Sequence, residues 1–308
     1  MALLLAFASV ASRLGGSVGT GLVHGLKLVA VAVVAQAVWE MARRLCTDIK
    51  RVVIAVLAVV IVSVTSSDYA QLIVIVFGAA LGFVLCRTNR LTPGPDLTSE
   101  VSGFGISRAA GMAALTLFLG LLFGLPMLAR LDANRALTVF DAFYRSGALV
   151  FGGGHVVLPL LQRQTVATGW VSPGDFLAGY GAAQAVPGPL FTFAAWLGWM
   201  KSSAPNRWMG ALLATAGVFL PGLLLVLAAL PFWHTLRARP SMAAALSGVN
   251  AAVVGLLAAA LYSPVWASAV HSSIDFGIAG IGFLLLSRWK VPPLAVVALC
   301  ALVGIWRA

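Results

Sequence analysis

Two segments rich in glycine and proline interrupt apolar sequence and carry polar side chains. Residues 151–162 read FGGGHVVLPLLQ, and residues 182–193 read AAQAVPGPLFTF. In hydrocarbon, every backbone N–H and C=O must be hydrogen-bonded within its own segment, so an interrupted helix is tolerated only where protein or a wet cavity surrounds it. Helix breakers at these two places therefore predict a site in which free backbone groups face a ligand.

The ligand that best matches such a site is an anion. A helix that restarts after a break directs its free N–H groups and the positive end of its dipole toward the gap. Candidate binding residues are the breaker residues themselves, the polar side chains beside them, and one matched pair of polar residues from two apolar helices. They are Arg145, Phe151, Gly152, Gly153, Gly154, His155, Gln184, Pro187, Gly188, Pro189, Lys27 and Asn250.

Each of these features also has a purely structural interpretation. Glycine runs allow membrane helices to pack closely, and a lone proline commonly produces only a kink. A histidine at a helix end is about as often a structural hydrogen-bonding group as a ligand or proton carrier. Arg145 is also placed to extend toward the membrane interface. The anion interpretation depends on the two breaks occurring together.

The composition identifies the solvent around these segments. Of the 308 residues, 61% are apolar and 9% are charged, and the mean hydropathy is +1.00. Soluble globular domains do not have this composition, so an all-α, polytopic inner-membrane fold with broken or re-entrant helices is expected. Apolar windows predict about ten spans, near residues 22–42, 52–66, 70–86, 109–128, 143–161, 176–199, 208–232, 243–266, 274–287 and 291–306.

The net charge of +11 does not indicate a nucleic-acid partner. The basic residues are scattered in pairs between apolar runs, such as Arg43–Arg44 and Lys50–Arg51, and this pattern sets the orientation of a membrane protein. The three cysteines are far apart, which favours neither disulfides nor a zinc site. The sequence has no nucleophile–base pair, metal-ligand cluster or phosphate-binding loop, so neither an enzyme nor a cofactor is expected.

An internal repeat relates two parts of the chain. Residues 21–42 align without gaps with residues 244–265 at an offset of 223, so that Lys27 meets Asn250. Both copies continue with a polar loop, a short apolar run, a second polar loop and a last apolar run. Two halves of one architecture are typical of secondary transporters. The matched Lys27 and Asn250 are therefore candidates for one pseudosymmetric site, or for an ordinary polar contact between helices.

The loop charges predict that the two copies are inverted. In the first copy the first loop carries four basic residues within 43–51, whereas in the second copy the basic residues, Arg288 and Lys290, lie in the second loop. By the positive-inside rule the copies have opposite orientations. The predicted division is a partial first half at 1–86, a cytoplasmic linker at 87–108 and a complete second half at 109–308.

The breaker segments also resemble a known family. The stretches RSGALVFGGGHVVLPLLQ (145–162) and GWVSPGDFLAGYGAAQAVPGPLFTFAAWLG (169–198) closely resemble the carboxyl half of the chromate ion transporter family, and residues 248–257 and 25–37 resemble it more weakly. Members of that family are multi-pass proteins of the bacterial inner membrane that export chromate. The resemblance implies chromate as the substrate, with sulfate as a structural look-alike, and no cofactor.

One departure from the family pattern leaves alternatives open. The family's first half normally has its own glycine-rich motif and Pro-Gly-Pro upstream of the stretch that here begins at residue 21, and this chain has neither. The expectation is a truncation of roughly 80 residues, with Met1 inside a membrane helix. The hypotheses are a chromate exporter that works by alternating access, a half-transporter or remnant without transport of its own, and a transporter of sulfate or another oxyanion. Besides the bilayer, the expected partner is a second copy or a separately encoded first half.

Overall fold

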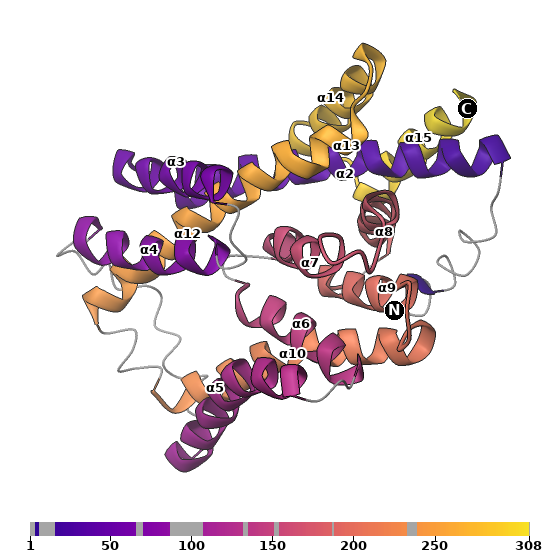
Figure 1. The fold of residues 1–308 in the computed structure, drawn as a ribbon. Coiled ribbons are helices and arrows are strands. Elements are labelled where there is room, and N and C mark those ends of the chain that lie inside the picture. The colour runs from indigo at the N-terminus through magenta and orange to yellow at the C-terminus, as the bar shows by residue number, and fades with distance from the viewer. Residues whose placement is uncertain are drawn as a thin grey trace.

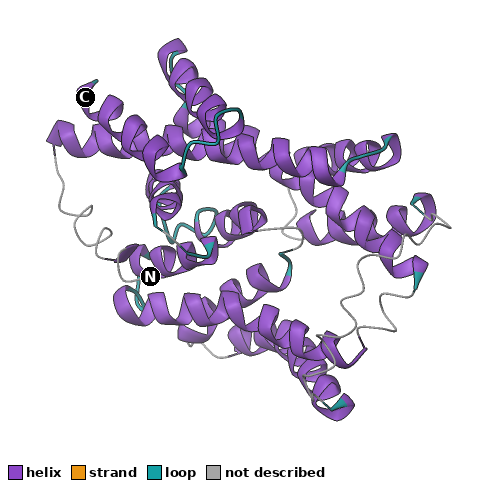
Figure 2. Cartoon of the chain, turned by 180° about the vertical axis from the view of Figure 1, so that it is seen from behind, coloured by secondary structure: helices purple, strands orange, loops and turns teal. Residues whose placement is uncertain are grey.

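The computed structural model describes residues 4–5, 16–65, 70–86, 107–131, 135–150, 154–186, 188–232 and 239–307. This part of the chain consists of helices and connecting segments and contains no strand, which confirms the predicted all-α class (Figures 1 and 2). The helices are α2 (Gly16–Leu45), α3 (Ile49–Val64), α4 (Ala70–Leu85), α5 (Arg108–Leu131), α6 (Arg135–Ala148), η3 (Gly154–Val156), α7 (Val157–Thr165), α8 (Pro173–Ala185), η4 (Leu190–Thr192), α9 (Phe193–Met200), α10 (Arg207–Ala229), η5 (Leu230–Phe232), α12 (Pro240–Ala260), η6 (Leu261–Trp266), α13 (Ala267–Ala269), α14 (Ser273–Ser287) and α15 (Pro293–Trp306).

Helix length separates two kinds of apolar helix. A straight helix needs about 20 residues to cross the roughly 30 Å hydrocarbon core, and four described segments are long and apolar enough: Gly19–Leu45, Arg108–Ala129, Arg207–Phe232 and Pro240–Ala269. The helices α3, α4, α14 and α15 have 16, 16, 15 and 14 residues and fall short of that length. A multi-pass membrane fold therefore holds, but the predicted count of about ten spans is not confirmed.

The outer surface supports the membrane assignment. On α5, the side chains of Leu117, Phe123 and Met127 are 51, 68 and 69% exposed. In water, a contiguous patch of such side chains would be an aggregation hazard. In a bilayer they contact lipid tails at no cost, so the exposed apolar faces fit a protein surrounded by hydrocarbon.

The two copies of the repeat exchange packing partners. Helix α2 packs against α14 and α15, whereas α12 packs against α3 and α4 (Figure 1). Glycines make both contacts possible. A Cβ at Gly25 would collide with the backbone of Cys300 and Ala301, and a Cβ at Gly248 would collide with the backbone of Gly78 and Gly82. Each long helix thus carries the hairpin of the other copy, with small residues that let the backbones approach closely.

Equivalent residues of the two copies make equivalent contacts. Gly25 and Gly248 differ by 223, the offset of the sequence alignment. About two helical turns further along each helix, Ala32 lies against Gly282, and its counterpart Gly255 lies against Ala55 and Ala58. The same offset of 223 therefore relates the contacts of α2 to those of α12. This equivalence supports the repeat predicted from the sequence.

The two long helices also run in opposite directions. In Figure 1, α2 begins at the right and runs to the left, whereas α12 begins at the lower left and runs toward α13. Antiparallel copies of one architecture are what an inverted repeat requires. The boundaries at residues 86 and 108 stay predictions, and residues 87–106 of the predicted linker lie outside the described residues.

A polar cluster joins α2 to both helices of the second hairpin. The buried carboxylate of Asp275, at the start of α14, accepts hydrogen bonds from Arg307 Nη1 at 2.7 Å and from the backbone N–H of His271 at 3.2 Å. His24 Nε2 of α2 lies 3.0 Å from the same carboxylate. Buried charges are stable only when they are paired and hydrogen-bonded, so this cluster fixes the hairpin to α2.

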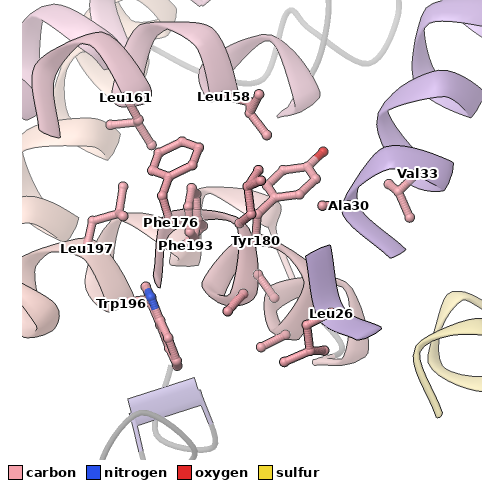
Figure 3. Packing of buried hydrophobic residues seen from close by; sticks show 14 of the residues in the cluster. Leu26, Ala30, Val33, Leu158, Leu161, Phe176, Tyr180, Phe193, Trp196 and Leu197 are labelled. Carbon is pink, nitrogen blue, oxygen red and sulfur yellow. The ribbon is translucent and has the colours of Figure 1, made fainter. Parts of the chain in front are cut away.

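Aromatic packing positions the segments that contain the breaks. Phe193 at the start of α9 makes edge-on contacts with Phe176 and Tyr180 of α8, at centroid distances of 5.1 and 5.6 Å. Figure 3 shows these rings together with Trp196, and it shows the Tyr180 hydroxyl directed toward α2 near Ala30. The tight cluster holds α8 and α9 on either side of the second break.

Candidate functional site

The second predicted break is present between α8 and η4. Helix α8 ends at Ala185, and Val186 is extended, with φ −95° and ψ 125°. Gly188 has a φ of 148°, which side-chain-bearing residues rarely adopt, and Pro189 is extended before the chain turns into η4. The Pro189 carbonyl accepts hydrogen bonds from the Thr192 N–H at 3.0 Å and the Thr192 hydroxyl at 2.9 Å. Pro187 lies outside the described residues.

The first predicted break separates α6 from α7. Helix α6 ends at Ala148, and the chain becomes helical again at Gly154, the first residue of η3, which leads into α7. His155 is the second residue of η3. Phe151, Gly152 and Gly153 lie outside the described residues, so their predicted role stays a prediction. The predicted interruption of the apolar run 143–161 is nevertheless present.

A cavity of about 520 Å³ lies where the two breaks meet. His155 lines it from the first break, and Gln184 and Gly188 line it from the second. These three predicted residues come together although 29 to 33 positions separate His155 from the other two. The described residues that line this break cavity are His155, Ala183, Gln184, Ala185, Val186, Gly188, Leu190, Pro292, Pro293 and Leu294.

Two polar side chains of the break cavity, His155 and Gln184, differ in their hydrogen bonding. His155 Nδ1 lies 2.7 Å from the hydroxyl oxygen of Tyr180, which is fully buried. The side-chain amide of Gln184, one turn after Tyr180 on α8, interacts with the same hydroxyl. The Gln184 Nε2 atom is buried and meets hydrogen-bond geometry with no group in the described part of the chain. Because its contact with the Tyr180 hydroxyl does not meet hydrogen-bond geometry, the amide N–H can donate to a ligand; a buried donor without a hydrogen bond costs about 1–3 kcal/mol.

The start of α15 is a component of the cavity that the sequence analysis missed. Pro292 is the N-cap of α15 and Pro293 its first residue, and both line the cavity with Leu294. The first N–H groups of a helix have no intrahelical acceptor and carry a positive partial charge. In α15 the Leu294 N–H is the group in question, because the two prolines have no N–H and the Ala295 N–H donates to the Pro292 carbonyl at 2.9 Å. The Pro-Pro pair marks a helix start in the sequence, but its position beside Gln184 depends on a contact that spans more than 100 residues.

The charges around the break cavity favour an anion. Among the described residues that line it, none is acidic. Arg288 and Lys290 lie in the exposed segment just before α15, and Lys290 adopts a left-handed conformation with φ 52°. An anion in the cavity would meet the Gln184 amide, the His155 imidazole and the Leu294 N–H, and the carboxylate that interacts with this site is that of Glu40, through His155.

Four predicted residues are not part of the cavity lining. Arg145 Nη2 lies 2.6 Å from the buried Asp141 carboxylate, one turn earlier on α6. Lys27 Nζ of α2 lies close to Gly174, at the start of α8. Asn250 is half-buried on α12, and Pro189 is exposed beside the cavity. The predicted pairing of Lys27 with Asn250 in one site is therefore not supported by a shared cavity.

Comparison with known proteins points in the same direction as the geometry. Residues 137–305 match the family described as "Chromate transporter", and this range contains both breaks and the start of α15. No solved structure matches the chain.

Three curated relatives show how much of their length is shared. A "Chromate transport protein" of Pseudomonas aeruginosa is 32% identical over 160 residues, which are 50% of this chain and 37% of the relative. A "Probable chromate transport protein" of Synechococcus elongatus is 27% identical over 168 residues, 53% of this chain and 41% of the relative. The "Uncharacterized transporter YwrA" of Bacillus subtilis is 25% identical over 174 residues, 54% of this chain and 93% of the relative. The chain thus spans about two fifths of the length of the two chromate transport proteins.

Proposed function

The chain belongs to the chromate transporter family, and we propose that its break cavity binds the chromate dianion during export across the bacterial inner membrane. The observation that carries this proposal is the buried amide nitrogen of Gln184, which meets hydrogen-bond geometry with no group in the described part of the chain and lies in a cavity whose described lining residues include no carboxylate. Transporters place their substrate where helices are broken, and helix N-termini there favour anions. Chromate enters this proposal through the relatives, which are chromate transport proteins.

The proposed contacts suit a tetrahedral oxyanion. Gln184 Nε2 donates one hydrogen bond, His155 donates a second through the ring nitrogen that does not face Tyr180, and the Leu294 N–H at the start of α15 supplies a third. Several directed donors around one small cavity match an ion with four equivalent oxygens. Sulfate has the same shape and charge, so it is expected to compete for the same contacts.

Each long helix forms a unit with the hairpin that packs against it: α2 with α14 and α15, and α12 with α3 and α4. In alternating access, movement of one unit against the other would open the cavity to one side of the membrane at a time.

The driving force for export is sufficient. With an interior negative by about 100 mV, moving a dianion outward releases roughly 4.6 kcal/mol. That energy sustains a concentration ratio on the order of a thousand.

The test of the proposed site is Gln184→Leu. Loss of a hydrogen bond to a charged group costs about 1.5–3 kcal/mol, so chromate binding to the purified chain should weaken by about tenfold or more. Chromate accumulation in cells that express the variant should rise accordingly. Unchanged binding in Gln184→Leu would remove the cavity from consideration as the chromate site.

The matched control is Gln71→Leu. Gln71 lies on α4 and donates to the Pro159 carbonyl at 3.0 Å, and neither residue is among the lining residues of the cavity. It makes the same chemical change in an apolar helix and should leave chromate binding unchanged. Equal losses in both variants would indicate a general effect on folding.

A second candidate function is that of a transporter subunit. The matched region makes up 93% of YwrA, so it forms nearly all of that protein. In this case the chain inserts into the membrane but exports chromate only with a second copy or a separately encoded first half. Export measured with the chain alone, and again with the first half co-expressed at matched membrane levels, separates the two candidates.

A further inference from the structure

The imidazole of His155 is held by a buried tyrosine. His155 lines the break cavity, and its Nδ1 atom lies 2.7 Å from the Tyr180 hydroxyl. Tyr180 is fully buried and is clamped edge-on by Phe193 at 5.6 Å (Figure 3). Because the tyrosine ring is buried and packed in this way, its hydroxyl is positioned as a partner for one ring nitrogen.

A fixed partner at Nδ1 determines what Nε2 can do. In the neutral imidazole one ring nitrogen donates and the other accepts, whereas both donate in the protonated form. With the Tyr180 hydroxyl at Nδ1, the remaining nitrogen is left for the cavity. A protonated ring then donates one N–H to the hydroxyl oxygen and the other to an anion, and it adds a positive charge beside that anion.

We propose that Tyr180 is a positioning residue that directs Nε2 of His155 into the break cavity, so that anion binding is coupled to the uptake of one proton by the imidazole. This inference rests on the proposed function of the cavity. The proton comes from water on the side to which the cavity is open and returns to water after the anion has left. A dianion that crosses together with this proton moves a net charge of −1, so the membrane potential then supplies half of the driving force given above. No bond of the anion changes.

The charged surroundings of His155 are compatible with this role. The titratable groups that face it are Tyr180 of α8 and Glu40 of α2, whose carboxylate interacts with it electrostatically. The other elements in contact with η3 are α12, η4 and α7. Helix α12 and η4 contain no ionisable residue, and in α7 the basic residue is Arg163, in the last turn. The segment before α15 contributes Arg288 and Lys290.

Sulfate binding to the purified full chain tests the proposal, because sulfate stays a dianion between about pH 5 and pH 8, the range in which histidine titrates. Linkage of one proton to one anion predicts that the affinity falls by up to about tenfold per pH unit above the titration midpoint. Calorimetry in two buffers with different ionisation enthalpies should report the uptake of up to about one proton per sulfate.

Two variants separate the coupling from the binding. His155→Gln keeps an amide donor in the cavity and should bind sulfate with no pH dependence and no proton uptake. Tyr180→Phe keeps the buried ring but leaves Nδ1 without its partner. It should lower the affinity several-fold at low pH and move the midpoint of the pH profile.

Tyr144→Phe is the matched control. Tyr144 is also fully buried, and its hydroxyl donates to the Phe118 carbonyl at 3.1 Å, between α6 and α5 and away from the cavity. Its variant should keep the wild-type pH profile. Thermal unfolding of both tyrosine variants shows whether either change acts through stability alone.

The outcomes are distinguishable. A wild-type chain that binds neither sulfate nor chromate at any pH contradicts the proposed function itself. Sulfate binding that is independent of pH overturns the proton coupling, and a Tyr180→Phe profile identical to that of the wild type overturns the positioning role of Tyr180; both outcomes leave the anion site in place.

Discussion

An ion pair within one helix accounts for a predicted polar residue that is not part of the cavity lining. Arg145 has Asp141 one turn away on its own helix, and that pairing is visible in the sequence as an i, i+4 spacing. Gln184 has no hydrogen-bond partner for its Nε2 atom in the described part of the chain. The helix breakers and the polar residues beside them could thus be predicted from the sequence. The role of Tyr180 could not, because an apolar context gives no sign that a tyrosine reaches a histidine 25 positions earlier.

Gly188 provides a test of the break at the level of a single residue. Its φ is 148°, and a Cβ at this position would meet no atom within 4 Å. Gly188→Ala therefore introduces backbone strain without a steric clash. A residue forced into this region costs about 1–3 kcal/mol, so the break should relax and chromate binding should weaken by about tenfold.

Gly120→Ala is the control for that experiment. Gly120 also has open space around it, but it lies within α5 and has no positive φ. Alanine in a helix is favoured over glycine by about 0.5–1 kcal/mol, so thermal stability should be equal or higher and chromate binding unchanged. If both variants bind chromate as the wild type does, the conformation of Gly188 is not required for the site.

At the level of helices, the repeat could be predicted but the exchange of partners could not. The offset of 223 follows from the order of apolar runs and loops, which any single copy displays. The contacts of Gly25 with Cys300 and of Gly248 with Gly78 depend on which surfaces meet in three dimensions. Small residues in apolar helices predict that a close contact exists, but not which helix makes it.

The Asp275 cluster predicts how firmly the second hairpin is held. In Asp275→Asn the bonds to Arg307 and His24 lose their charge–charge component, and a bond of this kind contributes about 1.5–3 kcal/mol. Hydrogen exchange should accelerate by at least about tenfold in α14 and α15. Exchange in α3 and α4, which pack on α12, should not change.

The surface pair Asp48–Arg51 is the comparison. Asp48 is the N-cap of α3 and its side chain is 47% exposed. Asparagine is an equally good N-cap, and exposed pairs contribute at most about 1 kcal/mol. Asp48→Asn should therefore leave exchange nearly unchanged throughout. Faster exchange in α3 and α4 after Asp275→Asn would show that the two hairpins are not held independently.

For the whole molecule, the predicted orientation can be tested directly. In a chain without its native cysteines, cysteines at Thr47 and Trp289 should react with reagents only from the cytoplasmic side, and one at Ser272 only from the outside. The basis is the exchange of basic loops between the two copies, together with the opposite directions of α2 and α12. Labelling of Thr47 and Ser272 from the same side would contradict the inverted repeat.

The exchanged packing also has a consequence for biosynthesis. Residues of α2 leave the ribosome about 250 positions before those of α15, whose backbone fills the surface at Gly25. At about 5–20 residues per second, that delay is roughly 13 to 50 s. During this time α2 is inserted without its partner, with a groove of small residues facing lipid or the insertion machinery. We expect the nascent protein to depend on an insertase or chaperone that shields this groove until translation of α15 is complete.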